Sequence, residues 1–124
     1  MKSAISLFSG IGGLDEGVHQ AGFTPLFCSE IDKNAFETLS HWCQRIKLSP
    51  ILARDINGID PPALKAELGL EANELDILSG GPPCQPFSLI GSRRAMRDDR
   101  GLLILKMLEF TRVFKPKAVL IEQV

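Results

Sequence analysis

The sequence places a cysteine in a stiff turn, and a thiol held in this way can act as a nucleophile. Residues 80–86 read Gly-Gly-Pro-Pro-Cys-Gln-Pro and follow an apolar run at 75–79. Glycine lets the backbone turn or approach a ligand closely, and proline fixes φ and restricts the preceding residue. Cys84 is therefore presented at the end of a buried strand, where substrate can reach it. A structural turn with an incidental cysteine is the alternative, but the arrangement is costly for that role alone.

A second reactive group, Glu122, follows the apolar run at 118–121. A helix-like segment at 102–114 joins this run to the one before Cys84, so we expect two parallel neighbouring strands with a right-handed crossover. Cys84 and Glu122 then converge on the sheet edge where open α/β sheets bind ligands. A thiol beside a carboxyl suits covalent attack on an electron-poor ring with protonation of a ring nitrogen. Taken alone, Glu122 reads as a surface acid.

A glycine loop lies between the first expected strand and the first expected helix, where residues 8–14 read Phe-Ser-Gly-Ile-Gly-Gly-Leu. The dinucleotide fingerprint would need glycine at the position of Asp15. Asp15 and Glu16 in the first helical turn would repel a pyrophosphate but not a cationic cofactor without phosphate. S-adenosylmethionine therefore suits this loop better than NAD. An ordinary α/β turn with helix-stabilising acids is the alternative.

Acidic residues follow the next two expected strands. Glu30 comes 20 residues after Gly10, a spacing at which nucleotide-binding folds hold ribose hydroxyls. Ile31 could pack on an adenine face, and Asp32 could cap the next helix. Asp55, next to Ile56, could accept a hydrogen bond from an adenine amino group, although a solvated loop acid explains it equally well.

Composition limits the class of protein. The 124 residues suffice for one domain, and a net charge of −1 excludes a globally basic nucleic-acid binder. Three cysteines without a C-x-x-C pair or a secretory signal predict a reduced, intracellular protein. No apolar run reaches membrane-spanning length. Cys28 is expected to be an inert core thiol, and His41-Trp42-Cys43 lacks the spacing partners of a metal site, so no metal is predicted.

Apolar runs alternate with helical patterns, which predicts a doubly wound α/β fold with a parallel sheet. Pro25 suggests that the second strand is an edge strand or starts late. The arginine-rich part of a long loop at 86–100 could close over phosphates or form a solvated charged surface. The sequence ends at a buried strand, which predicts a truncated product or one piece of a split protein with an unpaired edge. The expected strands are 4–8, 24–28, 51–53, 76–79 and 118–121, and the expected helices are 14–21, 33–42 (continuing to about 45), 61–68 and 102–114.

Taken in order, these motifs resemble the DNA (cytosine-5)-methyltransferases over essentially the whole chain. The resemblance is carried by the glycine loop, Glu30-Ile31-Asp32, Asp55-Ile56, the sequence Gly-Gly-Pro-Pro-Cys-Gln-Pro-Phe-Ser at 80–88, Arg-Gly-Leu-Leu at 100–103 and Glu-Gln-Val at 122–124. It implies a Rossmann-like fold of the S-adenosylmethionine-dependent methyltransferase type, truncated after about five strands. It also implies S-adenosylmethionine as cofactor and double-stranded DNA as partner.

The resemblance implies a role for each matching residue. Cys84 would add to C6 of a flipped-out cytosine, so that C5 takes the methyl group, and Glu122 would hydrogen-bond or protonate N3. The residues implied to hold the methionine and ribose side are Phe8, Gly10, Gly12, Gly13 and Leu14. Those implied to hold the ribose, the adenine and the remaining wall are Glu30, Ile31, Asp55, Ile56, Pro82 and Leu103. The implied DNA contacts are Gln85, Ser88, Arg93, Arg94 and Arg97.

Two departures from the family pattern stand out. Gln123 replaces the usual asparagine, and the target-recognition region and C-terminal motifs do not occur in residues 1–124. We therefore expect the N-terminal catalytic portion of a prokaryotic or phage-type cytoplasmic enzyme, either a fragment or one subunit of a split enzyme with a complementary C-terminal chain. It needs a C-terminal complement and is inactive or weak alone. The alternatives are a degenerate S-adenosylmethionine- or DNA-binding remnant and an unrelated cysteine enzyme that binds NAD or ATP. Asp15 and the lack of a phosphate-loop lysine argue against the last.

Overall fold

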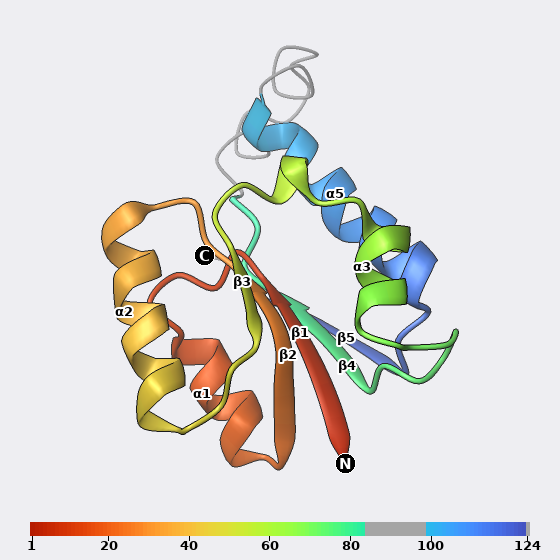
Figure 1. Cartoon of the computed structure of the whole chain (residues 1–124). Coiled ribbons are helices and arrows are strands. Elements are labelled where there is room, and N and C mark those ends of the chain that lie inside the picture. The colour runs from red at the N-terminus through yellow and green to blue at the C-terminus, as the bar shows by residue number, and fades with distance from the viewer. Residues whose placement is uncertain (84–98, 124) are drawn as a thin grey trace.

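The computed structural model describes residues 1–83 and 99–123, which form a parallel five-stranded sheet between two helical layers (Figure 1). The strand order is β3-β2-β1-β4-β5, so the chain winds outward from β1 in both directions. Connections that diverge from one strand in this way leave a crevice at its carboxyl end, where open α/β sheets bind ligands. The strands are β1 (Lys2–Leu7), β2 (Phe23–Ser29), β3 (Ile51–Ala53), β4 (Ile77–Gly80) and β5 (Ala118–Ile121).

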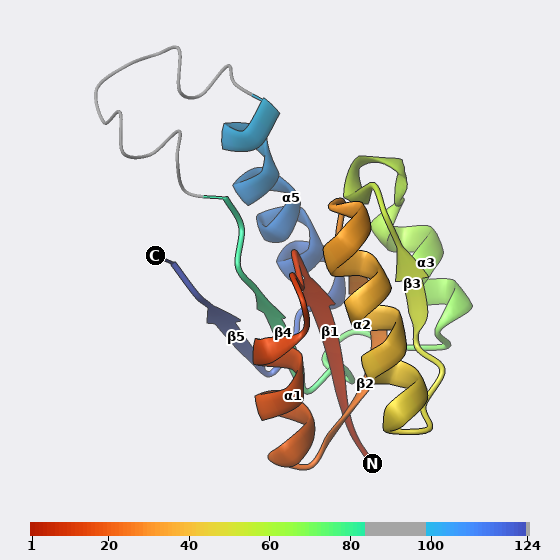
Figure 2. The same cartoon turned by 90° about the vertical axis from the view of Figure 1, so that its left-hand side faces the viewer.

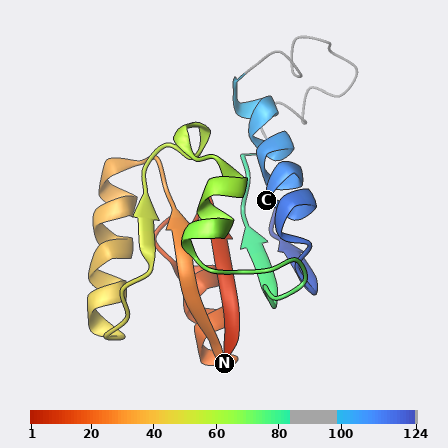
Figure 3. The same ribbon diagram turned by 45° about the vertical axis from the view of Figure 1, so that its right-hand side comes forward.

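The helices divide between the two faces of the sheet. Helices α1 (Gly13–Gln20) and α2 (Lys33–Arg45) cover one face, and α3 (Pro61–Glu67) and α5 (Asp99–Phe114) cover the other (Figures 2 and 3). A short 3₁₀ turn, η1 (Ile56–Gly58), follows β3. The Asp32 carboxylate caps α2 by accepting a hydrogen bond from the Ala35 N–H at 2.8 Å, which confirms the predicted cap.

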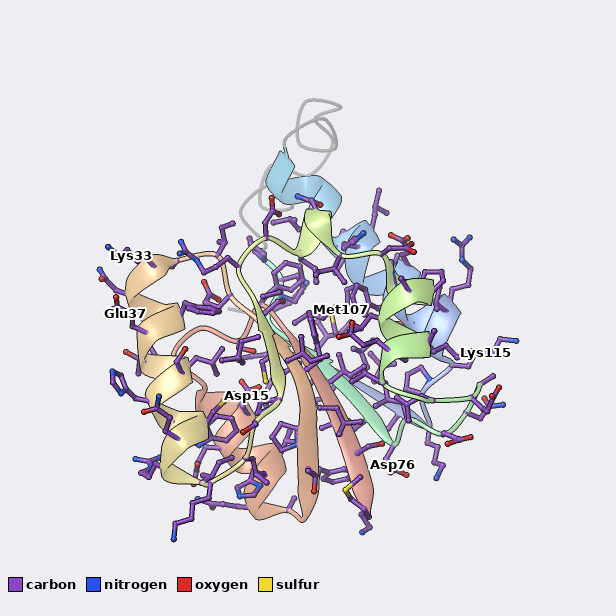
Figure 4. The ribbon with its side chains drawn as sticks, viewed as in Figure 1. Asp15, Lys33, Glu37, Asp76, Met107 and Lys115 are labelled. Carbon is purple, nitrogen blue, oxygen red and sulfur yellow. The ribbon has the colours of Figure 1, made fainter. Side chains whose placement is uncertain are left out.

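The two faces of the sheet are packed differently. Alternate strand residues such as Ile5, Leu7 and Leu78 join a large apolar cluster with α5, and Figure 4 shows Met107 on the side of α5 that faces the sheet. The opposite face has a smaller cluster under α2, made of Cys28, Leu39, Trp42 and Cys43. The other members of the large cluster are Phe27, Ile56, Leu64, Leu75, Phe110 and Phe114. Most of the apolar burial therefore lies on the α3/α5 side.

The expectation that the second strand is an edge strand or starts late is wrong, because β2 lies between β1 and β3 and begins at Phe23, before Pro25. Pro25 is paired with Ala4, and the register shifts between Ala4 and Ile5. An irregularity of this kind accommodates a residue that has no N–H to donate to the ladder. Helix α5 also begins earlier than expected, at Asp99 rather than at 102. The other elements agree with the predicted ones to within two residues at each end.

Strand β5 lies at the edge of the sheet, as predicted. Its Val119, Leu120 and Ile121 side chains are 41–42% exposed, which leaves an apolar border beside β4. Within residues 1–83 and 99–123, no helix combines the length and the apolar character needed to cross a bilayer.

Candidate active site

The loop after β1 has an unusual backbone. Phe8, Gly10 and Gly12 all have left-handed φ values, of 56°, 61° and 95°. Glycine adopts this region freely, but a bulky residue such as Phe8 does so only where the surroundings hold it, typically at functional sites. The Ser9 N–H donates to the Ser29 carbonyl oxygen at 2.8 Å, and the Phe8 N–H donates to Ser29 Oγ at 3.3 Å. The end of β2 therefore fixes the loop.

This loop borders a cavity of about 480 Å³, which we call the glycine-loop cavity. Four of the predicted cofactor residues line it together with Glu122, the predicted catalytic acid. Strands β4 and β5 are parallel neighbours as predicted, and the Glu122 N–H donates to the Gly80 carbonyl oxygen at 2.9 Å. The lining residues are Ser6, Phe8, Ser9, Gly10, Ile11, Gly13, Leu14, Asp15, Gly80, Gly81 and Glu122.

A second cavity of about 430 Å³, the Ile31 cavity, lies at the ends of β2 and β3. Glu30 is held there by two backbone amides: Gly10 N–H donates to Oε1 at 2.8 Å and Asp32 N–H donates to Oε2 at 2.9 Å. The Ile31 side chain is 61% exposed and forms part of the wall. The lining residues are Phe8, Gly10, Ser29, Glu30, Ile31, Arg54, Asp55, Ile56, Asn57, Gly81, Pro83 and Leu103.

The two cavities are adjacent, because Phe8, Gly10 and Gly81 line both. Each is of the size typical for small-molecule sites, about 300–1,000 Å³. Two adjoining cavities, which we together call the crevice, thus lie at one edge of the sheet, with Asp55 lining one and Glu122 lining the other. Asp55 also caps η1 by accepting a hydrogen bond from the Asn57 N–H at 2.9 Å. Its place in the cavity wall is compatible with binding an adenine amino group, and its capping role is compatible with an ordinary loop acid.

Two predicted cofactor residues lie elsewhere. Gly12 borders a third cavity on the outer side of the loop, where a side chain at this position would meet Leu39 Cδ1 at 3.3 Å. Pro82 is buried and is absent from the linings of both crevice cavities, whereas Pro83 lines the Ile31 cavity. The predicted nucleophile and the predicted DNA contacts lie outside the described residues: Cys84, Gln85, Ser88, Arg93, Arg94 and Arg97.

The acids of the first helical turn are not placed as the sequence argument assumed. Asp15 is only 4% exposed and points into the protein between α1 and the sheet (Figure 4). Its Oδ1 accepts from Ser9 Oγ at 3.3 Å and from Cys28 Sγ at 3.6 Å, while Oδ2 has no partner among the described residues. Burial raises the pKa of the Asp15 carboxyl above its ordinary value. The Glu16 carboxylate accepts from Trp42 Nε1, and this hydrogen bond lowers its pKa. Burial thus disfavours the charged form of Asp15, and the ionised Glu16 borders the third cavity rather than the glycine-loop cavity.

Sequence reasoning missed several lining residues. Ser6 and Ser9, whose hydroxyl oxygens are 2.8 Å apart, form the polar floor of the glycine-loop cavity. Gly81 belongs to the turn before Cys84, whose glycines indicate a close approach to a ligand but do not show that this one lines both cavities. Arg54 was overlooked beside Asp55, because an exposed arginine after a short strand carries no distinctive pattern. Cys28 is fully buried, and burial raises its thiol pKa well above the ordinary value, as expected of an inert core thiol.

Solved structures define the class of fold. The chain aligns over its full length with an E. coli prophage-encoded protein assigned as a DNA modification methyltransferase, with a TM-score of 0.77 and 29% identity, over 32% of that protein. It also aligns over its full length with Spodoptera frugiperda DNMT2, with a TM-score of 0.70, 22% identity and 36% of that chain, which is a likeness of fold. The fold is the Rossmann-like fold of S-adenosylmethionine-dependent methyltransferases.

The sequence comparisons define the family. The sequence pattern of the family described as C-5 cytosine-specific DNA methylase matches residues 2–124, and the chain belongs to this family. It is 39% identical to the type II methyltransferase M.AquIA of Picosynechococcus over 99% of this chain and 48% of that protein. It is also 39% identical to M.NgoBI of Neisseria gonorrhoeae over 100% of this chain and 35% of that protein. The chain thus spans half or less of these relatives, and an unrelated NAD- or ATP-binding cysteine enzyme is excluded.

Proposed function

We propose that this chain is the N-terminal, cofactor-binding and catalytic part of an enzyme that methylates C5 of cytosine in DNA. The observation that supports this most strongly is the pair of adjoining cavities, because Glu30 lines one, Glu122 lines the other, and three wall residues are shared. Such a pair suits a cofactor with an adenosine half and an amino-acid half, bound so that its reactive centre lies near Glu122. Family membership supplies the reaction class.

The residues of the crevice fit S-adenosylmethionine. Glu30 has lone pairs left for ribose hydroxyls after binding two amides, and Ile31 offers an exposed apolar face to a purine. The glycine-loop cavity is lined by the Glu122 carboxyl and by no described lysine or arginine, and the Asp15 carboxyl that also borders it is buried in the protein. Such a lining favours a cationic ligand over a phosphorylated one. When bound, this cofactor supplies an electrophilic methyl group.

The chemistry follows from the thiol and the carboxyl. The Cys84 thiolate would add to C6 of an extruded cytosine, which moves an electron pair to C5. Glu122 would hold or donate a proton at N3 and so stabilise the adduct. C5 would take the methyl group and leave S-adenosylhomocysteine. A base would then remove the C5 proton, the C5–C6 double bond would re-form, and the Cys84 thiolate would leave.

The substrate and partner follow from the same proposal. The substrate is double-stranded DNA, with Gln85, Ser88, Arg93, Arg94 and Arg97 as its contacts in this chain. Residues 1–124 act together with the target-recognition region and the C-terminal motifs, carried either on the same protein or on a complementary chain, in a restriction-modification context in the cytoplasm of a prokaryote or its phage. The fraction of each relative that this chain spans supports the need for those regions.

Covalent trapping tests the proposal. The protein is incubated with S-adenosylmethionine and a pool of random duplexes containing 5-fluorodeoxycytidine, with and without the C-terminal part of a relative. Fluorine at C5 cannot leave as a cation, so the methylated adduct persists and migrates as a protein–DNA species. In the presence of the C-terminal part we expect an adduct with the wild type and with the control variant Cys28→Ala, and none with Cys84→Ser; without that part we expect little or none.

Two outcomes would contradict the proposal. If no adduct forms in any mixture although S-adenosylhomocysteine binds to the folded protein, the chain is a degenerate cofactor-binding remnant. If Cys84→Ser traps DNA as well as the wild type does, the nucleophile is another residue.

A further inference from the structure

Arg54 connects the two turns that form the Ile31 cavity. It directly follows β3, and its Nε and Nη2 both donate to the Ile31 carbonyl oxygen, at 3.1 and 2.7 Å. Its guanidinium carbon lies 5.6 Å from the centre of the Phe36 ring on α2. One side chain thus fastens the end of β3 to the turn between β2 and α2 and rests on the helix that follows.

The turn that Arg54 holds carries the exposed wall of the cavity. Ile31 is a large apolar side chain with 61% of its surface exposed, so packing contributes little to its orientation. Its backbone is instead fixed on both sides: Glu30 N–H donates to the Ala53 carbonyl oxygen at 3.0 Å, and Asp32 N–H donates to Glu30 Oε2 at 2.9 Å. The Arg54 fork supplies the hydrogen bonds to Ile31 itself. Among the described residues, Arg54 supplies the side-chain hydrogen bonds to the Ile31 carbonyl oxygen, so its removal leaves this carbonyl unbound while both neighbouring residues stay fixed.

We propose that Arg54 is a positioning residue for the adenosine half of the cofactor, a proposal that rests on the function proposed above. Arg54 holds the Ile31 backbone so that the side chain is already placed when the purine arrives. A side chain that already has its ligand-bound orientation loses less conformational entropy on binding, which favours affinity. Since Arg54 also lines the cavity beside Asp55, it contributes to the same end of the crevice and leaves the glycine-loop cavity untouched.

The geometry requires arginine rather than any cation. The planar guanidinium presents two N–H groups to one oxygen while its face lies over an aromatic ring. A lysine ammonium is a point charge and can reach the carbonyl with one donor at a time. Arg54→Lys should therefore restore only part of what Arg54→Ala loses.

Calorimetric titration of the whole protein with two ligands tests this inference. S-adenosylhomocysteine fills both halves of the crevice, whereas 5′-methylthioadenosine lacks the amino acid and fills the adenosine half. We expect Arg54→Ala to weaken both ligands by the same factor, about tenfold, and Arg54→Lys to weaken both by about threefold. Arg45→Ala is the matched control, because this exposed arginine on α2 contacts Glu16 and borders only the third cavity; it should bind both ligands as the wild type does.

A second readout separates positioning from general stability. Hydrogen exchange of the amides at 30–33 should accelerate in Arg54→Ala while the midpoint of urea unfolding stays at the wild-type value. If the variant binds both ligands as tightly as the wild type, or weakens only S-adenosylhomocysteine, Arg54 does not position the adenosine wall. If the wild type binds neither ligand, the proposed function fails as well, and the inference fails with it.

Discussion

Replacing Gly80 with alanine should strain the strand that leads to the predicted catalytic turn. A Cβ at this position would lie 2.7 Å from the Leu7 carbonyl oxygen and 3.1 Å from both Sδ and Cε of Met107. Met107 can change rotamer, but Leu7 is paired with Gly80 in the sheet and its carbonyl cannot retreat without disturbing the β1–β4 ladder. Overpacking in a close-packed interior costs about 1–3 kcal/mol. Because the closest atom belongs to the backbone, we expect a loss of about 2–3 kcal/mol.

Urea-induced unfolding followed by circular dichroism measures this loss as a difference in the free energy of unfolding. Gly17→Ala is the control, because its Cβ would have no heavy atom within 4 Å and the residue lies inside α1. Alanine there should raise stability by about 0.5–1 kcal/mol. Replacing glycine with alanine should therefore lower the free energy of unfolding at position 80 and raise it at position 17. A Gly80→Ala protein within about 0.5 kcal/mol of the wild type would refute the steric argument.

Three further predictions concern the site and its surroundings. Burial raises the pKa of Asp15 above 3.8, so the wild type loses stability as the pH rises from 3.8 towards that raised pKa. Over this interval the free energy of unfolding of Asp15→Asn should rise relative to that of the wild type, and a pH-independent difference would contradict this. Glu122→Gln should keep the wild-type affinity for S-adenosylhomocysteine but reduce methyl transfer by the complemented enzyme by about 10²–10⁴; a loss in binding alone would assign Glu122 to the cofactor. In native protein, iodoacetamide should label Cys84 while Cys28 and Cys43 stay unmodified by mass spectrometry until urea unfolds the chain, because both are buried and burial raises their thiol pKa values.

The parts of the fold that could be read from the sequence are those with strong local signals. The runs at 118–121 and 51–53 are strands with the predicted bounds. A short apolar segment between polar turns is typical of a strand and too short for a helix. Helix α2 was bounded by a capping aspartate and an amphipathic pattern. The place of β2 in the interior of the sheet could not be predicted in this way, because strand order is decided by packing over long sequence distances rather than by local conformation.

The residues that line the crevice could be predicted where a motif fixes the backbone. They could not be predicted where the direction of a side chain depends on its tertiary neighbours. The glycine loop and Glu30 line the crevice as their spacing predicts, since both lie at strand ends. Asp15 was misjudged because the sequence shows a helix start but not which side of it faces the sheet. The inward direction follows from the tertiary fold, which brings Ser9 and Cys28 to its carboxyl group.

The two faces of the sheet are packed with different kinds of side chain. The α3/α5 face packs large apolar side chains such as Phe110 and Phe114, whereas the α1 face opposite them has the small polar residues Ser6 and Ser79 and the buried Asp15. Hydrogen bonds rather than apolar packing therefore hold the glycine loop against the sheet. Substitutions of Phe110 or Phe114, which line neither crevice cavity, should accordingly lower the free energy of unfolding with little change in ligand affinity, while substitutions in the polar layer should change both.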